Sequence, residues 1–293
     1  MWHNGEGQQQ QLGGTMGDIF PTWDSIDYGY LVQKARLVAF DLDGTLARSK
    51  MPMKPPVARL FSDLTHLCPV AVISGGKWGL IDSQVLSMVS GTARLSNLHL
   101  MPTTGTRYYT WNGEGWECRY EITIDGDLKQ KVMESLKSRA QQLGLWYDDS
   151  RVWSDRIEDR GSQITFSALG QHAPVDEKEK WDPDGSRREA LAKAVASDLP
   201  ELTVRAGGST SIDVSVKGID KAYAVRKLAE AMECDIPDIV FVGDRMSPEG
   251  NDYPAAAAGT YAVKVTGPED TEKFISRFID ARRKSGAVST MDA

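Results

Sequence analysis

Two aspartates, Asp41 and Asp43, stand one residue apart in the stretch LVAFDLDGTLARS (residues 37–49), where apolar residues precede them and a glycine follows. A carboxylate can attack phosphorus to form an aspartyl-phosphate, and a second carboxyl nearby can protonate the leaving oxygen and later deprotonate water. The same residues could instead shape an Asp-Gly turn after a strand. A calcium loop of the EF-hand type is excluded, because Leu46 and Pro52 stand where it needs a glycine and a glutamate.

Polar groups follow other apolar runs, or open a helix, at several points along the chain. Because the carboxyl ends of parallel strands meet at one crevice, we expect these groups to lie near Asp41. Simpler interpretations remain for three of them: Ser74 as a helix cap, Lys221 as a solvated lysine with Lys217 as its competitor, and Asp252 as a turn residue. The whole set consists of Ser74, Gly75, Lys221, Asp244, Asn251 and Asp252.

Short apolar runs alternate with helical spacing in two parts of the chain. The runs at 36–44 and 69–76 flank an amphipathic segment at 55–67, which is typical of a β-α-β unit with strands buried on both faces of a sheet. The pattern resumes after residue 219 with a helix, a buried strand at 238–244, a further strand and a closing helix. The sequence therefore predicts an α/β fold built on a parallel sheet.

The intervening segment has a different character. Strands are expected at 119–125, 162–169 and 201–216, and helices at 127–142 and 185–198. Because these strands lack the buried parallel signature, the segment indicates an inserted α+β domain. The predicted parts are a flexible N-terminal extension at 1–30, a core domain formed by 31–106 and 217–293, and a cap domain at 107–216.

The composition is that of an ordinary globular protein, with 41% hydrophobic and 26% charged residues among 293. A net charge of −7 argues against nucleic-acid binding, which needs clustered Lys and Arg. The three cysteines are far apart, so neither a disulfide framework nor a zinc site is indicated. No apolar stretch approaches the roughly 20 residues of a membrane span, and no signal peptide is evident. We therefore expect a cytoplasmic protein with no membrane or nucleic-acid partner.

Taken in their order along the sequence, these loops resemble the four signature motifs of the haloacid dehalogenase (HAD) superfamily of magnesium-dependent phosphotransferases. The resemblance implies a Rossmann-like core in which Asp41 is the nucleophile and Asp43 the general acid and base. It also implies that Ser74, Gly75 and Lys221 bind the transferring phosphoryl group. Mg²⁺ prefers hard oxygen ligands, and the implied ligand set is Asp41, the Asp43 carbonyl and Asp244, with Asn251 and Asp252 orienting the shell.

Two longer stretches narrow the resemblance. VFVGDRMSPEGNDYPAAAAG at 240–259 and VRAGGSTSIDVSVKGIDKAY at 204–223 are similar to parts of the eukaryotic-type phosphomannomutases, which belong to HAD subfamily IIB. The resemblance implies a cap that closes over a phosphosugar substrate, with Ser211 and Asp213 facing the sugar and Arg160 binding a phosphate. It is also compatible with a homodimer.

Two positions depart from the mutase pattern. Gln171 stands where the mutases have a cap arginine, and Trp153 stands near the position of another phosphate-binding arginine. A mutase must hold a bisphosphorylated sugar in both orientations, which needs strong positive charge in the cap, although Arg151, Arg156 and Arg205 could compensate. We therefore favour a Mg²⁺-dependent phosphohydrolase that acts on a phosphorylated sugar through an aspartyl-phosphate. A hexose phosphate mutase of the phosphomannomutase type is the alternative, and a non-catalytic binding protein on the same fold is a third hypothesis.

Overall fold

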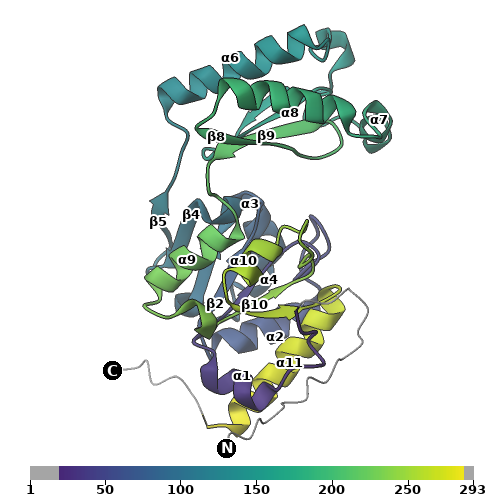
Figure 1. The fold of residues 1–293 in the computed structure, drawn as a ribbon. Coiled ribbons are helices and arrows are strands. Elements are labelled where there is room, and N and C mark those ends of the chain that lie inside the picture. Colours follow the sequence, from purple (N-terminus) through teal and green to yellow (C-terminus); the bar gives the residue numbers. More distant parts are fainter. Residues whose placement is uncertain (1–19, 287–293) are drawn as a thin grey trace, which may run out of the picture.

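The computed structural model describes residues 20–286, which contain two β-sheets, one above the other in Figure 1. The larger sheet has seven strands, listed in spatial order as β11 (Tyr261–Lys264), β10 (Ile239–Gly243), β1 (Leu37–Phe40), β2 (Val70–Ile73), β3 (Leu98–Met101), β4 (Arg107–Trp111) and β5 (Trp116–Glu121). Strands β11 to β3 pair in parallel, whereas β4 and β5 form an antiparallel edge. Strands β1, β2 and β10 are apolar and completely buried, as strands covered by helices on both faces must be.

Helices cover both faces of this sheet. The rings of Phe40 in β1 and Phe274 in α11 (Pro268–Lys284) pack with centroids 6.2 Å apart, which joins strand to helix in the core. Among residues 20–286, no helix is long and apolar enough to cross a membrane. One face packs against α1 (Tyr28–Lys34), α2 (Pro55–Thr65), α3 (Trp78–Ile81), a π-helical turn (Asp82–Leu86), α4 (Ser87–Val89) and α11 (Pro268–Lys284). The other packs against α9 (Lys221–Ala231) and α10 (Tyr253–Ala257), with α5 (Pro102–Gly105) after β3.

The smaller sheet has four antiparallel strands and its own apolar core. In spatial order its strands are β6 (Ile157–Asp159), β7 (Gln163–Ser167), β9 (Ser211–Val216) and β8 (Leu202–Ala206). Helices α6 (Gly126–Gln142) and α8 (Ser186–Asp198) lie over one face, and α7 (Val175–Trp181) lies at one end (Figure 1). Leu136, Phe166 and Val195 are buried between helices and sheet. Short 3-10 turns occur at Leu95–Asn97, Asp149–Arg151 and Ile236–Asp238.

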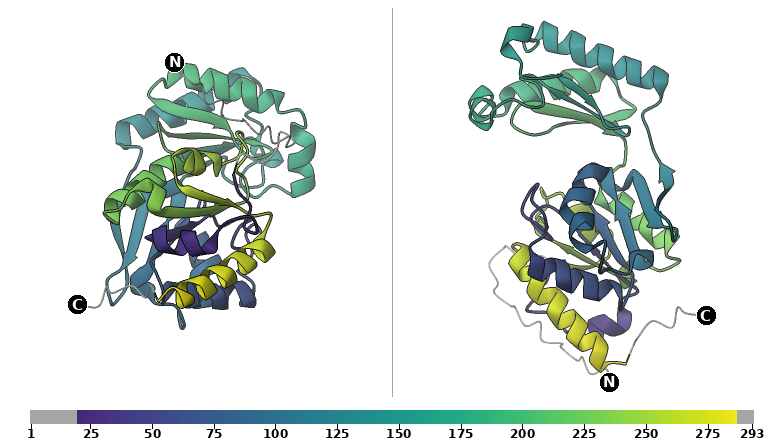
Figure 2. Two further views of the ribbon diagram at one scale, coloured as in Figure 1. Left: turned by 60° about the horizontal axis from the view of Figure 1, so that its bottom comes forward. Right: turned by 180° about the vertical axis from the view of Figure 1, so that it is seen from behind.

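The face of the smaller sheet away from α6 and α8 lies toward the larger sheet (Figure 2). This face is polar, because the apolar residues that alternate along β7 and β9 pack in the core beneath the helices. Polar contacts join the parts: the hydroxyls of Ser162 and Thr106 lie 2.6 Å apart, and Lys77 pairs with Glu158 of β6. A polar surface therefore lies opposite the parallel core. The strand register aligns one row of this surface across all four strands, consisting of Glu158, Thr165, Asp213 and Arg205.

Residues 107–121 lie in the larger sheet, although the sequence placed them in the cap. Strand β4 pairs with β3, with Thr110 opposite His99, and β5 pairs with β4. The strand expected at 119–125 is β5, which ends at Glu121. The sequence did not predict β3, a strand of only four residues. Without β3, the sequence offered no partner in the core for β4 and β5, and the prediction therefore assigned both strands to the inserted domain. The two-domain division stays a prediction, with its first boundary moved to the link between β5 and α6.

Residues 20–30, predicted to belong to a flexible extension, pack on the core instead. The Trp23 N–H donates to the Lys264 carbonyl at 3.1 Å, and the Tyr28 hydroxyl donates to the Trp23 carbonyl at 2.6 Å. Helix α1 begins at Tyr28 after Asp27, whose side chain accepts the Tyr30 N–H. The prediction for residues 20–30 is therefore wrong, and the rest of the extension, residues 1–19, lies outside the described part of the chain.

The close approach of α5 to α9 depends on Gly105, and this can be tested. Its φ is +78°, and a Cβ there would lie 2.5 Å from the Ala224 Cβ. We expect Gly105→Ala to lower the free energy of unfolding by about 3 kcal/mol, because left-handed strain and overpacking add. The control Gly113→Ala shares the positive φ, at +103°, but meets nothing within 4 Å, and should cost only about 1 kcal/mol. Equal losses in urea denaturation would contradict the packing explanation.

Candidate active site

Three carboxylates gather at the carboxyl end of the parallel sheet. Asp41 follows β1 and Asp244 follows β10, and these strands are parallel neighbours with Phe40 opposite Val242. Asp252 stands just before α10 and is completely buried. One oxygen from each of Asp41, Asp244 and Asp252 lies within 4.8 Å of the others. The predicted convergence of these loops is therefore present.

A buried lysine balances part of this negative charge. Lys221 is the first residue of α9, which Asp220 caps, and its ammonium pairs with Asp41 and lies 2.5 Å from Asp252 Oδ1. Burial alone would lower the pKa of Lys221, but the two carboxylates outweigh it and raise the pKa, so the lysine stays charged. The solvated-lysine interpretation is wrong for Lys221. The competing Lys217 donates to the Pro200 carbonyl instead.

The carboxylates outnumber their lysine, which bears on metal binding. Burial raises the pKa of Asp41 to about 7, with Asp252 adding to the rise and Lys221 opposing it. Burial and Asp252 also raise the pKa of Asp244, against a 3.1 Å hydrogen bond from the Thr45 hydroxyl. Three carboxylates facing one ammonium supply hard oxygen donors and excess negative charge, which fits Mg²⁺. Asn251, the other predicted contributor, is exposed beside Asp252.

Gly44 allows the first loop to approach Asp244. Its φ is +90°, and a Cβ at this position would lie 2.5 Å from Asp244 Oδ2. Its N–H donates to the Ala47 carbonyl at 2.7 Å, which closes the turn after Asp43. The Asp-Gly turn and the chemical interpretation are thus compatible, because the turn brings the aspartates of two loops together.

Asp43 is oriented by a residue that sequence analysis missed. Its Oδ1 accepts hydrogen bonds from the Lys50 N–H at 2.9 Å and from Gln84 Nε2 at 3.1 Å. Gln84 is completely buried in the π-helical turn, and its amide also donates to the Met51 carbonyl at 3.0 Å. Such turns often occur at functional sites, but nothing in the local sequence indicates one here.

Ser74 and Gly75 lie beyond β2, the strand next to β1. Ser74 is buried, and its hydroxyl oxygen accepts the Gly76 N–H at 3.0 Å while its own N–H donates to the Met101 carbonyl. The following helix is capped at Lys77 instead, so the helix-cap interpretation of Ser74 is wrong. The Ser74 hydroxyl proton is left to donate to another acceptor.

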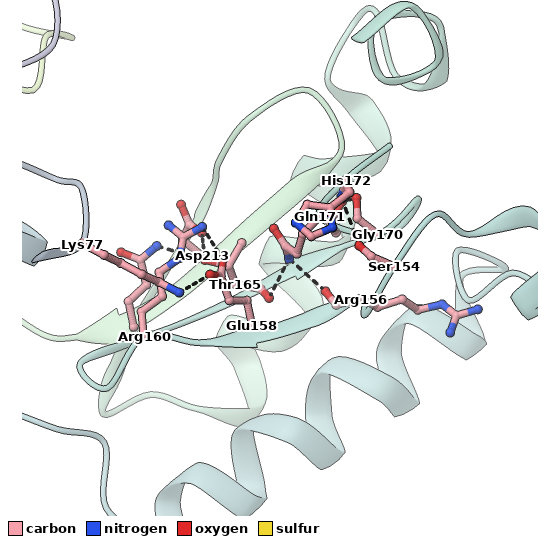
Figure 3. Close-up of polar contacts among 12 residues, drawn as sticks. Lys77, Ser154, Arg156, Glu158, Arg160, Thr165, Gly170, Gln171, His172 and Asp213 are labelled. Carbon is pink, nitrogen blue, oxygen red and sulfur yellow. Dashed lines mark hydrogen bonds and ion pairs between the residues drawn. The ribbon is translucent and has the colours of Figure 1, made fainter. Parts of the chain in front are cut away.

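Two of the three predicted cap residues, Arg160 and Asp213, lie on the polar face of the smaller sheet in Figure 3, and the strand alternation places Ser211 on the same face. Arg160 donates through Nε and Nη2 to Glu158 Oε2, at 2.9 and 2.7 Å. Asp213 accepts the Thr165 hydroxyl at 2.6 Å, and Ser211 lies two residues before it on the same strand. These cap residues therefore share one surface, and none of the three is hydrogen-bonded or ion-paired to Asp41, Asp244 or Asp252. Glu158 links the cap to the core through Lys77.

Two of the three arginines proposed to compensate for the mutase pattern have other partners. Gln171 donates its amide to the carbonyls of Arg156 and Thr165, at 3.2 and 3.4 Å (Figure 3). The Arg156 guanidinium lies 4.7 Å from the centre of the Trp146 ring, and Arg151 stacks in a similar way on Tyr147. Arg205 alone of the three stands on the polar row, opposite Asp213. The cap thus carries few cations aimed at a ligand.

Solved structures of HAD-type enzymes share this architecture. The chain is similar to the trehalose-6-phosphate phosphatase of Aspergillus fumigatus, with a TM-score of 0.55 and 17% identity over 89% of this chain and 99% of that one. A haloacid dehalogenase-like hydrolase from Bacteroides thetaiotaomicron gives a TM-score of 0.57 and 14% identity, covering 86% and 99%. The chain therefore has the HAD fold, as the sequence predicted.

Within this fold, the resemblance to the eukaryotic phosphomannomutases is confirmed. The family model described as eukaryotic phosphomannomutase matches residues 149–281. The phosphomannomutase of Spinacia oleracea is 27% identical over 246 residues, covering 82% of this chain and 94% of that protein. That of Saccharomyces cerevisiae is 22% identical over 260 residues, covering 87% and 98%.

From the carboxylate cluster we predict that the protein binds Mg²⁺, and this can be tested without an activity assay. Mg²⁺ should raise the midpoint of thermal unfolding, because it neutralises buried carboxylates in the folded state only. Asp244→Asn should weaken Mg²⁺ binding by at least about tenfold in calorimetry, while Asp280→Asn, an exposed control, should leave it unchanged. Undiminished binding in Asp244→Asn would show that the ion binds elsewhere.

Proposed function

We propose that this protein is a Mg²⁺-dependent phosphohydrolase of sugar phosphates that works through an aspartyl-phosphate. The observation that carries the proposal is the cluster in which buried Asp41, Asp252 and Lys221 meet half-buried Asp244, at the carboxyl end of the parallel sheet and opposite the polar face of a cap. A non-catalytic binding protein would have no need to bury two carboxylates around one lysine, at a cost in desolvation.

The first step forms the intermediate. An Asp41 carboxylate oxygen attacks phosphorus, the bond from phosphorus to the sugar oxygen breaks, and Asp43 gives its proton to that oxygen. Ser74, the Gly75 amide and Lys221 donate to the phosphoryl oxygens, where charge builds up in the transition state. When bound by Asp41, the Asp43 carbonyl and Asp244, with Asn251 and Asp252 in support, Mg²⁺ would relieve the repulsion between carboxylate and phosphate.

The second step releases phosphate. Water gives a proton to Asp43 and attacks phosphorus, and the bond to Asp41 breaks to restore both carboxyl groups. In the cap, Ser211 and Asp213 would bind sugar hydroxyls, and Arg160 would approach the substrate's anionic group. Closure of such a cap excludes bulk water until the intermediate has formed.

The distribution of charge in the cap favours hydrolysis of a sugar phosphate over its isomerisation by a mutase reaction. Gln171 is bonded to backbone carbonyls, and Arg151 and Arg156 stack on aromatic rings of the cap itself. A second phosphate would therefore meet little unpaired positive charge among the described cap residues. The mutase remains the second candidate, because the relatives similar over most of the chain are named phosphomannomutases. The homodimer stays a prediction.

Phosphate release tests the proposal. With Mg²⁺, the protein should release inorganic phosphate from at least one member of a panel of hexose monophosphates. Asp41→Asn should abolish release, because an amide cannot act as the nucleophile, whereas Asp280→Asn should retain it. Absence of release across the panel would overturn the phosphohydrolase proposal.

A second assay separates the two reactions. Mannose 1-phosphate would be incubated with and without a hexose bisphosphate activator, and both the 6-phosphate isomer and free phosphate would be measured. We expect free phosphate to form faster than the isomer under both conditions. Isomer formation that outpaces phosphate release would establish the mutase instead.

The hydrogen bond from Gln84 predicts a dependence on the leaving group. Gln84→Met should slow hydrolysis of a hexose phosphate by about tenfold, because a misplaced Asp43 protonates the sugar oxygen poorly. The first-turnover release of nitrophenolate from p-nitrophenyl phosphate, which reports the first step alone, should slow by less than about threefold, since nitrophenolate leaves without a proton. An equal loss in this first step with both substrates would show that Gln84 does not act through protonation of the leaving oxygen.

A further inference from the structure

Glu158 occupies the position between the only cation of the cap predicted to bind phosphate and a cation of the core. Its carboxylate accepts two hydrogen bonds from Arg160 and pairs with Lys77, which follows the Ser74 loop (Figure 3). The side chains of Glu158 and Arg160 are 30% and 26% exposed, so water screens their interaction only in part. One carboxylate thus engages two cations at the mouth of the candidate site.

The ionised state of Glu158 is maintained by these partners. Partial burial would raise its pKa, but hydrogen bonds from Lys77 and Arg160 outweigh burial and lower it. The carboxylate is therefore charged near neutral pH. Arg160 can place its guanidinium on a substrate anion only by sharing it with Glu158 or by displacing Glu158.

The neighbouring charges on the polar face follow the same pattern. Arg205 stands directly opposite Asp213 in the strand register, so cation and anion again face each other. Together with Glu158 and its two partners, this makes a group of three cations and two carboxylates. A dianionic second phosphate would turn the small net positive charge of this group into a net negative charge, whereas neutral sugar hydroxyls would leave it unchanged.

We propose that Glu158 determines substrate specificity by neutralising Arg160 and Lys77, so that the cap accepts the uncharged end of a sugar monophosphate and disfavours a sugar bisphosphate. This inference rests on the proposed function and deepens it, because it names the residue that separates a monophosphatase from an enzyme that binds bisphosphates. Glu158 acts through Arg160 and is not itself a catalytic residue.

The test compares mannose 6-phosphate with mannose 1,6-bisphosphate as substrates of the full chain. Glu158→Gln keeps the shape of the side chain and removes its charge, so the ratio of kcat/KM for bisphosphate to that for monophosphate should rise by about tenfold. The matched control is Asp159→Asn. Asp159 is the next residue of β6, points to the opposite face and pairs there with Lys129, so the ratio should not change.

A further variant separates charge from the link between cap and core. Lys77→Met breaks that link but leaves Glu158 on Arg160, so the ratio should not rise. A rise as large as in Glu158→Gln would assign the effect to cap opening and overturn the inference. An unchanged ratio in a folded Glu158→Gln protein would overturn it as well.

Binding measurements keep this inference distinct from the proposed function. In an Asp41→Asn background, calorimetry with the same two sugars reports affinity without turnover. When Glu158→Gln is added, the affinity for the bisphosphate should rise about tenfold relative to the affinity for the monophosphate. If the wild-type protein releases no phosphate, the phosphohydrolase proposal fails, while this affinity ratio still decides the role of Glu158: a rise supports it, and no change overturns it.

Discussion

A buried lysine held between two buried carboxylates organises the core. Lys221 begins α9, Asp41 follows β1, and Asp252 precedes α10, so one charged contact joins three elements that are distant in the sequence. Burying such charges is costly, and removing one partner of a buried pair typically costs about 3–5 kcal/mol. The loops that carry these residues therefore have little freedom to move apart, and Gly44 lets a fourth group, Asp244, join them.

The two parts of the chain handle charge in opposite ways. In the core, burial raises the pKa of Asp41, and three carboxylates around one ammonium leave an excess of negative charge that a divalent cation would relieve. On the cap, Glu158 pairs with Arg160 of the cap and with Lys77 of the core. Strong unbalanced charge thus lies where phosphorus would react, and a nearly neutral surface lies where the rest of the substrate would bind.

Much of the core could be predicted from the sequence, because short apolar strands followed by polar loops are a local pattern. Asp41, Asp244 and Lys221 all lie at the ends of such elements, and the helix expected at 127–142 is α6 within one residue. Residues 107–121 were misassigned, because their place depends on pairing with the short strand β3. Gln84 and Glu158 were missed for a related reason: Gln84 meets Asp43, and Glu158 meets Lys77, only through contacts between residues that are distant in the sequence. No spacing rule marks a glutamine or a glutamate of that kind.

The nucleophilic role of Asp41 is the central claim, and mass spectrometry of the acid-quenched enzyme tests it most directly. The protein would be mixed with a hexose phosphate and Mg²⁺, quenched during turnover and digested. We predict a phosphoryl group on the peptide that contains residues 37–49, located on Asp41, with none in samples that lack substrate. Phosphate release without this adduct, or with the phosphoryl group on a different residue, would contradict the claim.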